Sequence, residues 1–342
     1  MSEHKILIGN SNDMNSISDE SVNLIVTSPP YPMVEMWDEI LGEQNAAISD
    51  ALNTGDGMKA FKEMHRVLND IWKECDRVLS KNGFICINIG DATRTINGDF
   101  KLYSNHTMVI NYFTSLGYSV LPDIHWRKQT NAPNRFMGSG MYPAGAYVTY
   151  EHEYILIFRK GGKRVFNGEE RKLRQKSAYF WEERNVWFSD LWDIKGTSQM
   201  IYAPKTSRER SAAFPFEIPY RLINMYSVEG DTVLDPFVGL GTTTLAAMAA
   251  NRNSYGIEID KSIADIAMDT INNSVSGLNN IIDARISAHH KFIENLPEDK
   301  KEKCYENINL GCKVKTRQEK DITISKIKDY TINDYAINCN YY

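Results

Sequence analysis

Four consecutive residues near the start of the chain combine a small hydroxyl, a rigid corner and an aromatic plate: Ser28, Pro29, Pro30 and Tyr31. They follow the apolar run 22–27, which is short and β-branched and predicts a buried strand. Proline has no amide proton and fixes its own φ, so a central strand does not continue through this pair. On these residues alone, the corner is either part of a binding site or simply the end of a strand.

A second group of residues surrounds a glycine-rich turn after the strand expected at 231–237. Gly239 and Gly241 let the backbone approach a ligand closely, and free amides at the start of the helix near Thr242 suit an anionic group such as a carboxylate. Glu258 ends the next expected strand, about 20 residues later, where a carboxylate can hold two ribose hydroxyls. The order strand, loop, helix, strand predicts a site for a nucleoside-bearing cofactor.

A nicotinamide dinucleotide is the competing ligand for this loop. Gly239-x-Gly241 is half of its fingerprint, but the third small position is Thr244 and the sequence offers no hydride chemistry. A lone G-x-G also occurs in ordinary tight turns, and Glu258 alone could be a residue at the surface. The order of these residues along the chain is what favours a cofactor site.

Both groups of residues need a sheet to hold them. The runs 22–27, 83–90 and 231–237 are typical of buried strands, and apolar residues recur at helical spacing from Phe61 to Leu79. Strand, helix, strand is the unit of a parallel sheet, and a second such unit surrounds the glycine-rich turn. The sequence therefore predicts an α/β fold, in which ligands gather at the carboxyl ends of the strands.

The composition is that of an ordinary globular chain. Of 342 residues, 42% are hydrophobic and 24% are charged, and the formal net charge is −5. No apolar stretch approaches the roughly 20 residues that span a bilayer, and no secretory signal is found, so we expect a cytoplasmic protein without a membrane partner. The five cysteines lack metal-ligand spacing, which predicts reduced thiols and no metal site.

The corner "TSPPY" and the loop "DPFVGLGTT" together resemble the catalytic and cofactor motifs of the amino-methyltransferases of DNA, which move the methyl group of S-adenosylmethionine to an exocyclic base nitrogen. The resemblance covers most of residues 5–285, and the motif order is that of the β subgroup, whose recognition segment lies between the two motifs. It implies a Rossmann-like methyltransferase fold, a mostly parallel sheet with helices on both faces, plus a small target-recognition subdomain. It also implies double-stranded DNA as the partner and a target base that leaves the helix.

The resemblance gives roles to individual residues. Ser28 and Pro29 would accept hydrogen bonds from the target amine, held rigid by Pro30, and Tyr31 would stack on the base. The implied cofactor site consists of Asn10 (where the family usually has Asp), Thr27, Phe214, Pro215, Asp235, Phe237, Gly239, Gly241, Thr242 and Glu258. Phosphate contacts are expected from Arg127 and Lys128, and from Lys163, Arg164, Arg171 and Lys172 in the basic run 159–176. By itself such a run is more typical of a solvated loop.

We expect four segments along the chain. These are a catalytic half at 1–160, a target-recognition segment at 161–207, the cofactor-binding half of the same α/β domain at 208–287 and a C-terminal extension at 288–342. The stretch 34–58 is acidic and longer than the usual link of the family. It could be a lid over the target base or a dimer contact.

Serine before Pro-Pro-Tyr is more typical of cytosine-N4 methylation in this family, and aspartate of adenine-N6 methylation. The leading hypothesis is a sequence-specific DNA methyltransferase acting on cytosine N4 in a restriction-modification or epigenetic system. A homodimer and a cognate restriction endonuclease are further candidate partners. The alternatives are adenine-N6 methylation, a DNA-binding protein that keeps the fold without activity, and methylation of RNA or of a small amine.

Overall fold

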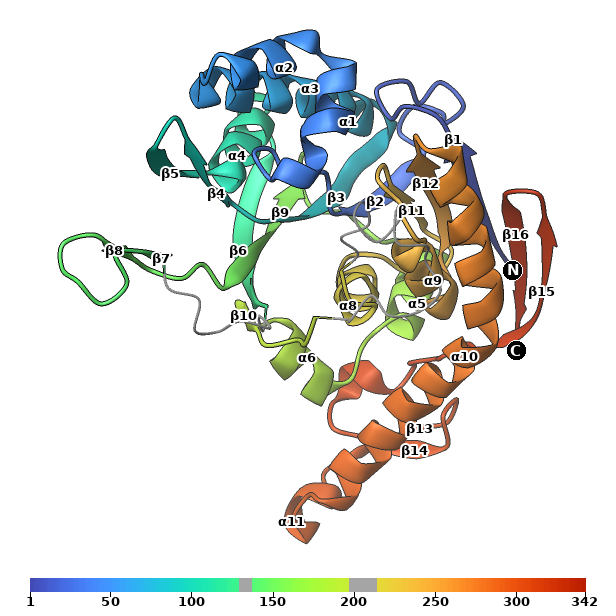
Figure 1. The fold of residues 1–342 in the computed structure, drawn as a ribbon. Helices are drawn as coiled ribbons and strands as arrows, with labels where there is room; N and C mark the ends of the chain where they lie inside the picture. Colours follow the sequence, from blue (N-terminus) through green and yellow to red (C-terminus); the bar gives the residue numbers. More distant parts are fainter. Residues whose placement is uncertain (129–136, 197–213) are drawn as a thin grey trace.

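The computed structural model describes residues 1–128, 137–196 and 214–342 (Figure 1). In these residues a large mixed sheet is formed by β1 (Ser2–Ile8), β2 (Val22–Thr27), β3 (Leu79–Ile89), β6 (Ser119–Arg127), β9 (His152–Arg159), β10 (Leu191–Trp192), β11 (Thr232–Asp235), β12 (Asn253–Glu258), β15 (Ile327–Asn333) and β16 (Ala336–Tyr341). Their spatial order is β10-β6-β9-β3-β2-β11-β12-β1-β16-β15. Separate hairpins are formed by β4 (Ala92–Ile96) with β5 (Asp99–Tyr103), β7 (Met137–Gly138) with β8 (Ala146–Tyr147), and β13 (Tyr305–Asn307) with β14 (Cys312–Val314).

The centre of the sheet is parallel, with β3, β2, β11, β12 and β1 paired in this order. β2 and β11 are direct neighbours, and Ile25 lies opposite Leu234. The carboxyl ends of parallel strands meet at one edge of the sheet. Thr27 and Asp235, which end these two strands, therefore come together although 208 residues separate them in the chain.

Helices cover both faces of the sheet (Figure 1). They are α1 (Asp38–Gln44), α2 (Ala46–Asn53), α3 (Gly57–Val78), α4 (Asn105–Ser115), α5 (Gly168–Lys176), α6 (Trp181–Trp187), α8 (Glu217–Tyr226), α9 (Thr242–Ala249), α10 (Lys261–Glu294) and α11 (Glu298–Lys301), with short 3-10 turns at Glu35–Trp37 and Arg317–Glu319. Apolar residues of α3 and α4 form one buried cluster with the sheet, and those of α8, α9 and α10 form another. The predicted Rossmann-like α/β fold is confirmed. None of the helices in the described ranges has the length and apolar character needed to cross a membrane.

Helix α3 forms where the apolar spacing predicts a helix, but it ends earlier than expected. In the sequence, Asn82 and Gly83 are residue types typical of a helix end, whereas the helix ends at Val78. Leu79 is already paired with Val22 of β2, and the register of β2 and β3 shifts immediately afterwards. Asn82, with φ of +68°, therefore lies at an irregularity within β3 and not at a helix end.

Several elements cross or join the segments that we expected from the sequence. β10, in the expected segment 161–207, pairs with β6 in the main sheet, and residues 197–207 of that segment lie outside the described residues. α10 continues without a break through residue 287. The hairpin β15–β16 extends the sheet at β1. The division into four segments stays a prediction.

Candidate active site

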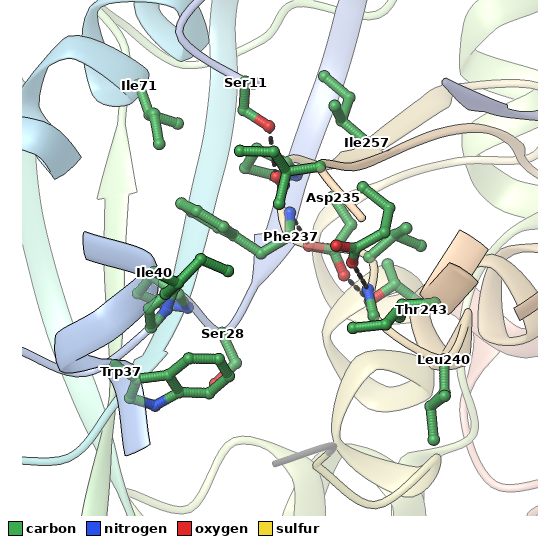
Figure 2. Close-up of a pocket in the computed structure, with 18 of the residues that line it drawn as sticks. Ser11, Ser28, Trp37, Ile40, Ile71, Asp235, Phe237, Leu240, Thr243 and Ile257 are labelled. Atoms are coloured by element: carbon green, nitrogen blue, oxygen red, sulfur yellow. Dashed lines mark hydrogen bonds between the residues drawn. The ribbon is translucent and has the colours of Figure 1, made fainter. Parts of the chain in front are cut away.

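One cavity lies at the carboxyl ends of β2 and β11, and both predicted groups of residues line it (Figure 2). Ser28 to Tyr31 form one part of its wall, and the loop 236–240 after β11 forms another. Further lining residues are Asn10, Ser11, Trp37, Ile40, Gln44, Ile71, Phe214, Asp235, Thr242, Thr243, Ile257, Glu258, Ile259 and Ile263. Two motifs far apart in the sequence thus share one cavity.

Asp235 ties the two strand ends together beneath this cavity. Its carboxylate accepts hydrogen bonds from Thr27 Oγ1 and Thr243 Oγ1, both at 2.6 Å, and from the amide of Phe237 at 3.0 Å. Burial raises the pKa of Asp235 to about 6, and the three hydrogen bonds oppose that rise. The buried carboxylate therefore joins the end of β2, the glycine-rich turn and the first turn of α9.

The turn itself places backbone and a second carboxylate at the cavity wall. Gly239 and Gly241 have φ of +50° and +83°, which glycine adopts at little cost. A Cβ at Gly241 would lie 2.8 Å from Ile271 of α10, so the turn also needs the missing side chain. Glu258, at the end of β12, accepts from the amides of Gly239 at 3.2 Å and Asp260 at 3.1 Å. Burial raises the pKa of Glu258 to about 7.

The Ser28–Tyr31 corner is held by hydrogen bonds from neighbouring strands. The Tyr31 hydroxyl lies 3.1 Å from Ser28 Oγ and donates to Glu153 Oε2 on β9 at 2.8 Å. Asn88 of β3 donates from Nδ2 to the Tyr31 hydroxyl at 2.8 Å and to Glu153 Oε2 at 2.7 Å. Burial and the nearby charge of Glu153 raise the pKa of Tyr31 well above its usual value, so its phenol keeps its proton at neutral pH.

The remaining residues predicted for the cofactor site divide into two groups. Asn10 and Phe214 line the cavity, and Asn10 donates to Gln44 Oε1 at 3.1 Å. Thr27, Pro215 and Gly241 are not among its lining residues. The side chain of Thr27 instead binds Asp235.

The six predicted DNA contacts do not lie together. Arg127 ends β6 and Lys128 follows it, at the edge of the sheet where the cavity opens, and Lys128 Nζ lies 2.9 Å from Glu153 Oε1. Because β9 runs antiparallel to β3, the run after Arg159 begins at the opposite edge. There Arg164 pairs with Asp231, just before β11, at 2.7 Å. The other members of the run, Lys163, Arg171 and Lys172, lie in or near α5 and are exposed. The structure does not bring this run to the cavity.

Sequence reasoning missed Glu153 and Asn88 as parts of the site. Glu153 precedes an apolar run and Asn88 interrupts one, which are weak signals that become specific only when β3 and β9 are known to be neighbours. Trp37, Ile40 and Gln44 reach the cavity from the acidic stretch. Of the two roles left open for this stretch, this geometry favours a cover over the site.

The family model of the N6/N4 DNA methylases matches residues 22–269 of this chain, which therefore belongs to that family. The cavity shared by the two motifs and the Rossmann-like sheet agree with this assignment. The chain is a β-class DNA amino-methyltransferase, a site-specific enzyme that acts on DNA.

One relative extends the match over nearly the whole chain, and others match more than three quarters of it. The Type II methyltransferase M.MthZI of Methanothermobacter thermautotrophicus is 52% identical over 330 residues, covering 96% of this chain and 91% of that protein. The Type II methyltransferase M.MjaI of Methanocaldococcus jannaschii is 50% identical over 279 residues, covering 78% and 91%. A putative DNA modification methylase of Thermus thermophilus, solved with S-adenosyl-L-methionine, has a TM-score of 0.61 and 29% identity over 79% of this chain and 93% of that one.

Proposed function

We propose that this enzyme transfers the methyl group of S-adenosylmethionine to N4 of a cytosine that has left the DNA helix, within a specific sequence. The observation that carries the proposal is the single cavity lined by Ser28–Tyr31 and by the loop after β11. The Type II names of the two archaeal relatives support a restriction-modification system, with a cognate endonuclease as a separate partner. We place the reaction in the prokaryotic cytosol. A homodimer stays a further proposal.

The residues present fit the cofactor. Glu258 offers a carboxylate to ribose hydroxyls. The apolar side chains of Phe237 and Ile257 line the same cavity and suit a purine. Phe214 lies on the same cavity and is proposed for the methionine side, and Asn10 for the adenine. Thr27 and Asp235 support this site from below through their hydrogen bond. When bound, S-adenosylmethionine supplies an electrophilic methyl group: the nitrogen lone pair forms the new bond to carbon, and the carbon–sulfur bonding pair stays on sulfur.

The corner residues are proposed to prepare the target nitrogen. An exocyclic amine is a poor nucleophile because its lone pair is delocalised into the ring. Acceptors at its two N–H groups, Ser28 Oγ and the Pro29 carbonyl, favour a pyramidal nitrogen with an available lone pair. Pro29 and Pro30 have no amide protons, so the backbone here offers the amine only acceptors. Tyr31 is proposed to stack on the base. After transfer the positively charged nitrogen releases one proton to solvent, which restores the neutral amine.

Phosphate contacts are proposed for Arg127 and Lys128, because both lie at the edge where the cavity opens. Contacts from Lys163, Arg164, Arg171 and Lys172 would need DNA that reaches the opposite edge of the sheet. We propose that these four contribute less. The adjoining residues 129–136 lie outside the described residues.

Two other functions compete with cytosine-N4 methylation. Adenine-N6 methylation would use the same cavity, and the serine before Pro-Pro-Tyr is the feature that favours cytosine. An inactive DNA-binding protein would have no need of both an intact corner and an intact cofactor loop. The test is to incubate purified enzyme with labelled S-adenosylmethionine and duplex DNA, and to identify the labelled nucleoside by mass spectrometry. We expect N4-methylcytosine. Labelled N6-methyladenine would establish adenine-N6 methylation instead, and the absence of a labelled nucleoside would favour an inactive DNA-binding protein.

A further inference from the structure

Glu153 is the hub of a hydrogen-bonded chain that ends at the catalytic corner. It lies at the amino end of β9, and because this strand is antiparallel to β3 its start reaches the edge where β2 ends. The Glu153 side chain is only 12% exposed. Its Oε2 atom accepts from the Tyr31 hydroxyl and from Asn88 Nδ2, while Oε1 faces Lys128 Nζ.

The chemistry of these groups fixes the direction of each hydrogen bond. A carboxylate only accepts, so the single hydroxyl proton of Tyr31 points to Glu153. The Asn88 amide is fixed as well, since the opposite orientation would place its oxygen 2.7 Å from a carboxylate oxygen. The 3.1 Å contact between Ser28 Oγ and the Tyr31 hydroxyl must then be donated by Ser28.

We propose that Glu153 is a positioning residue that, through Tyr31, turns the Ser28 hydroxyl proton away from the cavity, so that Ser28 Oγ meets the target amine as an acceptor. This inference rests on the proposed function of Ser28. Asn88 Nδ2 also lies 3.4 Å from Ser28 Oγ, but its two protons already serve the Tyr31 hydroxyl and Glu153 Oε2, so this longer contact is at most a shared one and leaves the direction of the Ser28–Tyr31 bond unchanged. The buried Asn88 Oδ1 has no partner in the described residues, as expected if the Nδ2 contacts decide how this amide lies.

The orientation matters because, of the two groups proposed to meet the target amine, the Pro29 carbonyl can only accept whereas the Ser28 hydroxyl can also donate. The prolines offer only carbonyl oxygens, whereas a free hydroxyl rotates and can donate as readily as it accepts. A proton donated to the amine nitrogen would occupy the lone pair that must attack the methyl group. The chain from Glu153 removes this competing state before the base arrives.

The test compares Glu153→Gln with Glu151→Gln in the full-length enzyme. The introduced glutamine keeps the shape of Glu153 but loses the charge and can turn its own amide towards Tyr31. Glu151 is a matched control because it is a carboxylate two residues earlier in the chain, paired with Arg127 at 3.6 Å. We expect the single-turnover methylation rate of Glu153→Gln to fall roughly 10- to 100-fold, by analogy with the loss on removing outer-shell groups that orient metal ligands. The Kd values for DNA and S-adenosylmethionine should stay close to wild type, and Glu151→Gln should keep the wild-type rate.

Tyr31→Phe provides a second route, because it keeps the ring and removes the relay. It should lose rate as well, and adding Glu153→Gln to it should cost little more, since the relay is already broken. Wild-type rates in Glu153→Gln or in Tyr31→Phe, or fully additive losses, would overturn the inference. An inactive wild-type enzyme would instead refute the proposed function.

A readout without turnover separates positioning from general damage. In enzyme labelled with ¹³Cζ-tyrosine, the Tyr31 resonance can be assigned by its loss in Tyr31→Phe. Glu153→Gln should shift this resonance while the other tyrosine resonances and the unfolding temperature change little. The resonance should not move in Glu151→Gln. An unmoved resonance in Glu153→Gln would show that the carboxylate does not hold the phenol.

Discussion

Two carboxylates at the cavity have raised pKa values for the same reason but make different contacts. Burial raises the pKa of Asp235 to about 6 and that of Glu258 to about 7. Asp235 receives three hydrogen bonds that already join structural elements. Glu258 receives only backbone amides and lines the cavity, so it retains capacity for donors on a ligand. Of the two, Glu258 is the carboxylate whose protonation cofactor binding should change.

We predict that S-adenosylmethionine binding releases protons near pH 7. Free Glu258 is partly protonated there, whereas ribose hydroxyl donors favour the carboxylate and lower its pKa in the complex. Affinity should therefore rise as the pH increases from 6 to about 7 and level off above the pKa of the free protein. Titration calorimetry in buffers of different ionisation enthalpy measures the release. Glu258→Gln should abolish it; the same release in that variant, or proton uptake in wild type, would contradict the assignment.

Among individual residues, those in contiguous motifs are predicted well from the sequence, whereas single residues that contact a motif from another strand are predicted poorly. Ser28–Tyr31 and the loop with Gly239 are recognisable because their residue types are unusual in combination. Glu153 is an ordinary glutamate before an apolar run, and only the antiparallel pairing of β9 gives it a place at the corner. No local pattern carries that pairing.

The structure places part of the acidic stretch 34–58, which the sequence left as a lid or a dimer contact, at the wall of the cavity. Leu41 of α1 and Ile48 of α2 are buried together with residues of α3 such as Met64, in a cluster separate from the two that pack on the sheet. This packing holds Trp37 and Gln44 at the cavity, and Gln44 accepts from Asn10. The stretch is therefore anchored to the domain while part of it walls the proposed cofactor site.

We predict that Trp37→Ala weakens S-adenosylmethionine binding roughly 10-fold, or about 1.4 kcal/mol, because an aromatic wall of the cavity is lost. Calorimetry measures the change in Kd. Trp181→Ala serves as the control, since Trp181 lies on α6, stacks on Phe292 and does not line the cavity. Equal losses in both variants would mean that general destabilisation is responsible, and an unchanged Kd for Trp37→Ala would remove the stretch from the site.

Helices and strands with a strong apolar periodicity were predicted from the sequence. Boundaries and pairings that depend on contacts with distant strands were missed. Helix α3 follows its apolar spacing, yet its end is set by the pairing of Leu79 with Val22 and not by Asn82. The polar, β-prone end of the chain gave no sign that β16 would pair with β1. Such pairings depend on contacts between residues distant in the chain, 57 positions apart for Val22 and Leu79 and 337 for Ser2 and Cys339.

Across the whole molecule, basic residues at opposite edges of the sheet have different access to the cavity. Arg127 lies at the cavity edge and is largely exposed, with Glu151 at 3.6 Å. Arg171 lies on α5, whose following residue Ser177 contacts Glu229 just before β11, at the other edge. Because the chain as a whole carries a net charge of −5, attraction of DNA depends on where the basic residues lie and not on how many there are.

We predict that Arg127→Gln lowers the salt dependence of DNA binding, reducing the slope of log K against log[salt] by about 0.9, the value for one lost phosphate contact. Arg171→Gln removes the same charge and should leave the slope unchanged. Fluorescence anisotropy with duplex DNA at several salt concentrations measures both. A larger change for Arg171→Gln would mean that DNA is held at the opposite edge.

Helix α10 contacts both the glycine-rich turn and α6. Its 34 residues correspond to roughly 50 Å. Ile271, about a third of the way along α10, packs where Gly241 turns, and Arg285, farther along, pairs with Glu183 of α6. Removing one partner of such a buried pair typically costs about 3–5 kcal/mol. Helix α6 lies in the predicted target-recognition segment 161–207. If that prediction holds, an exchange of this segment between relatives has to keep an acid at position 183, because its loss would leave Arg285 of α10 without its carboxylate partner.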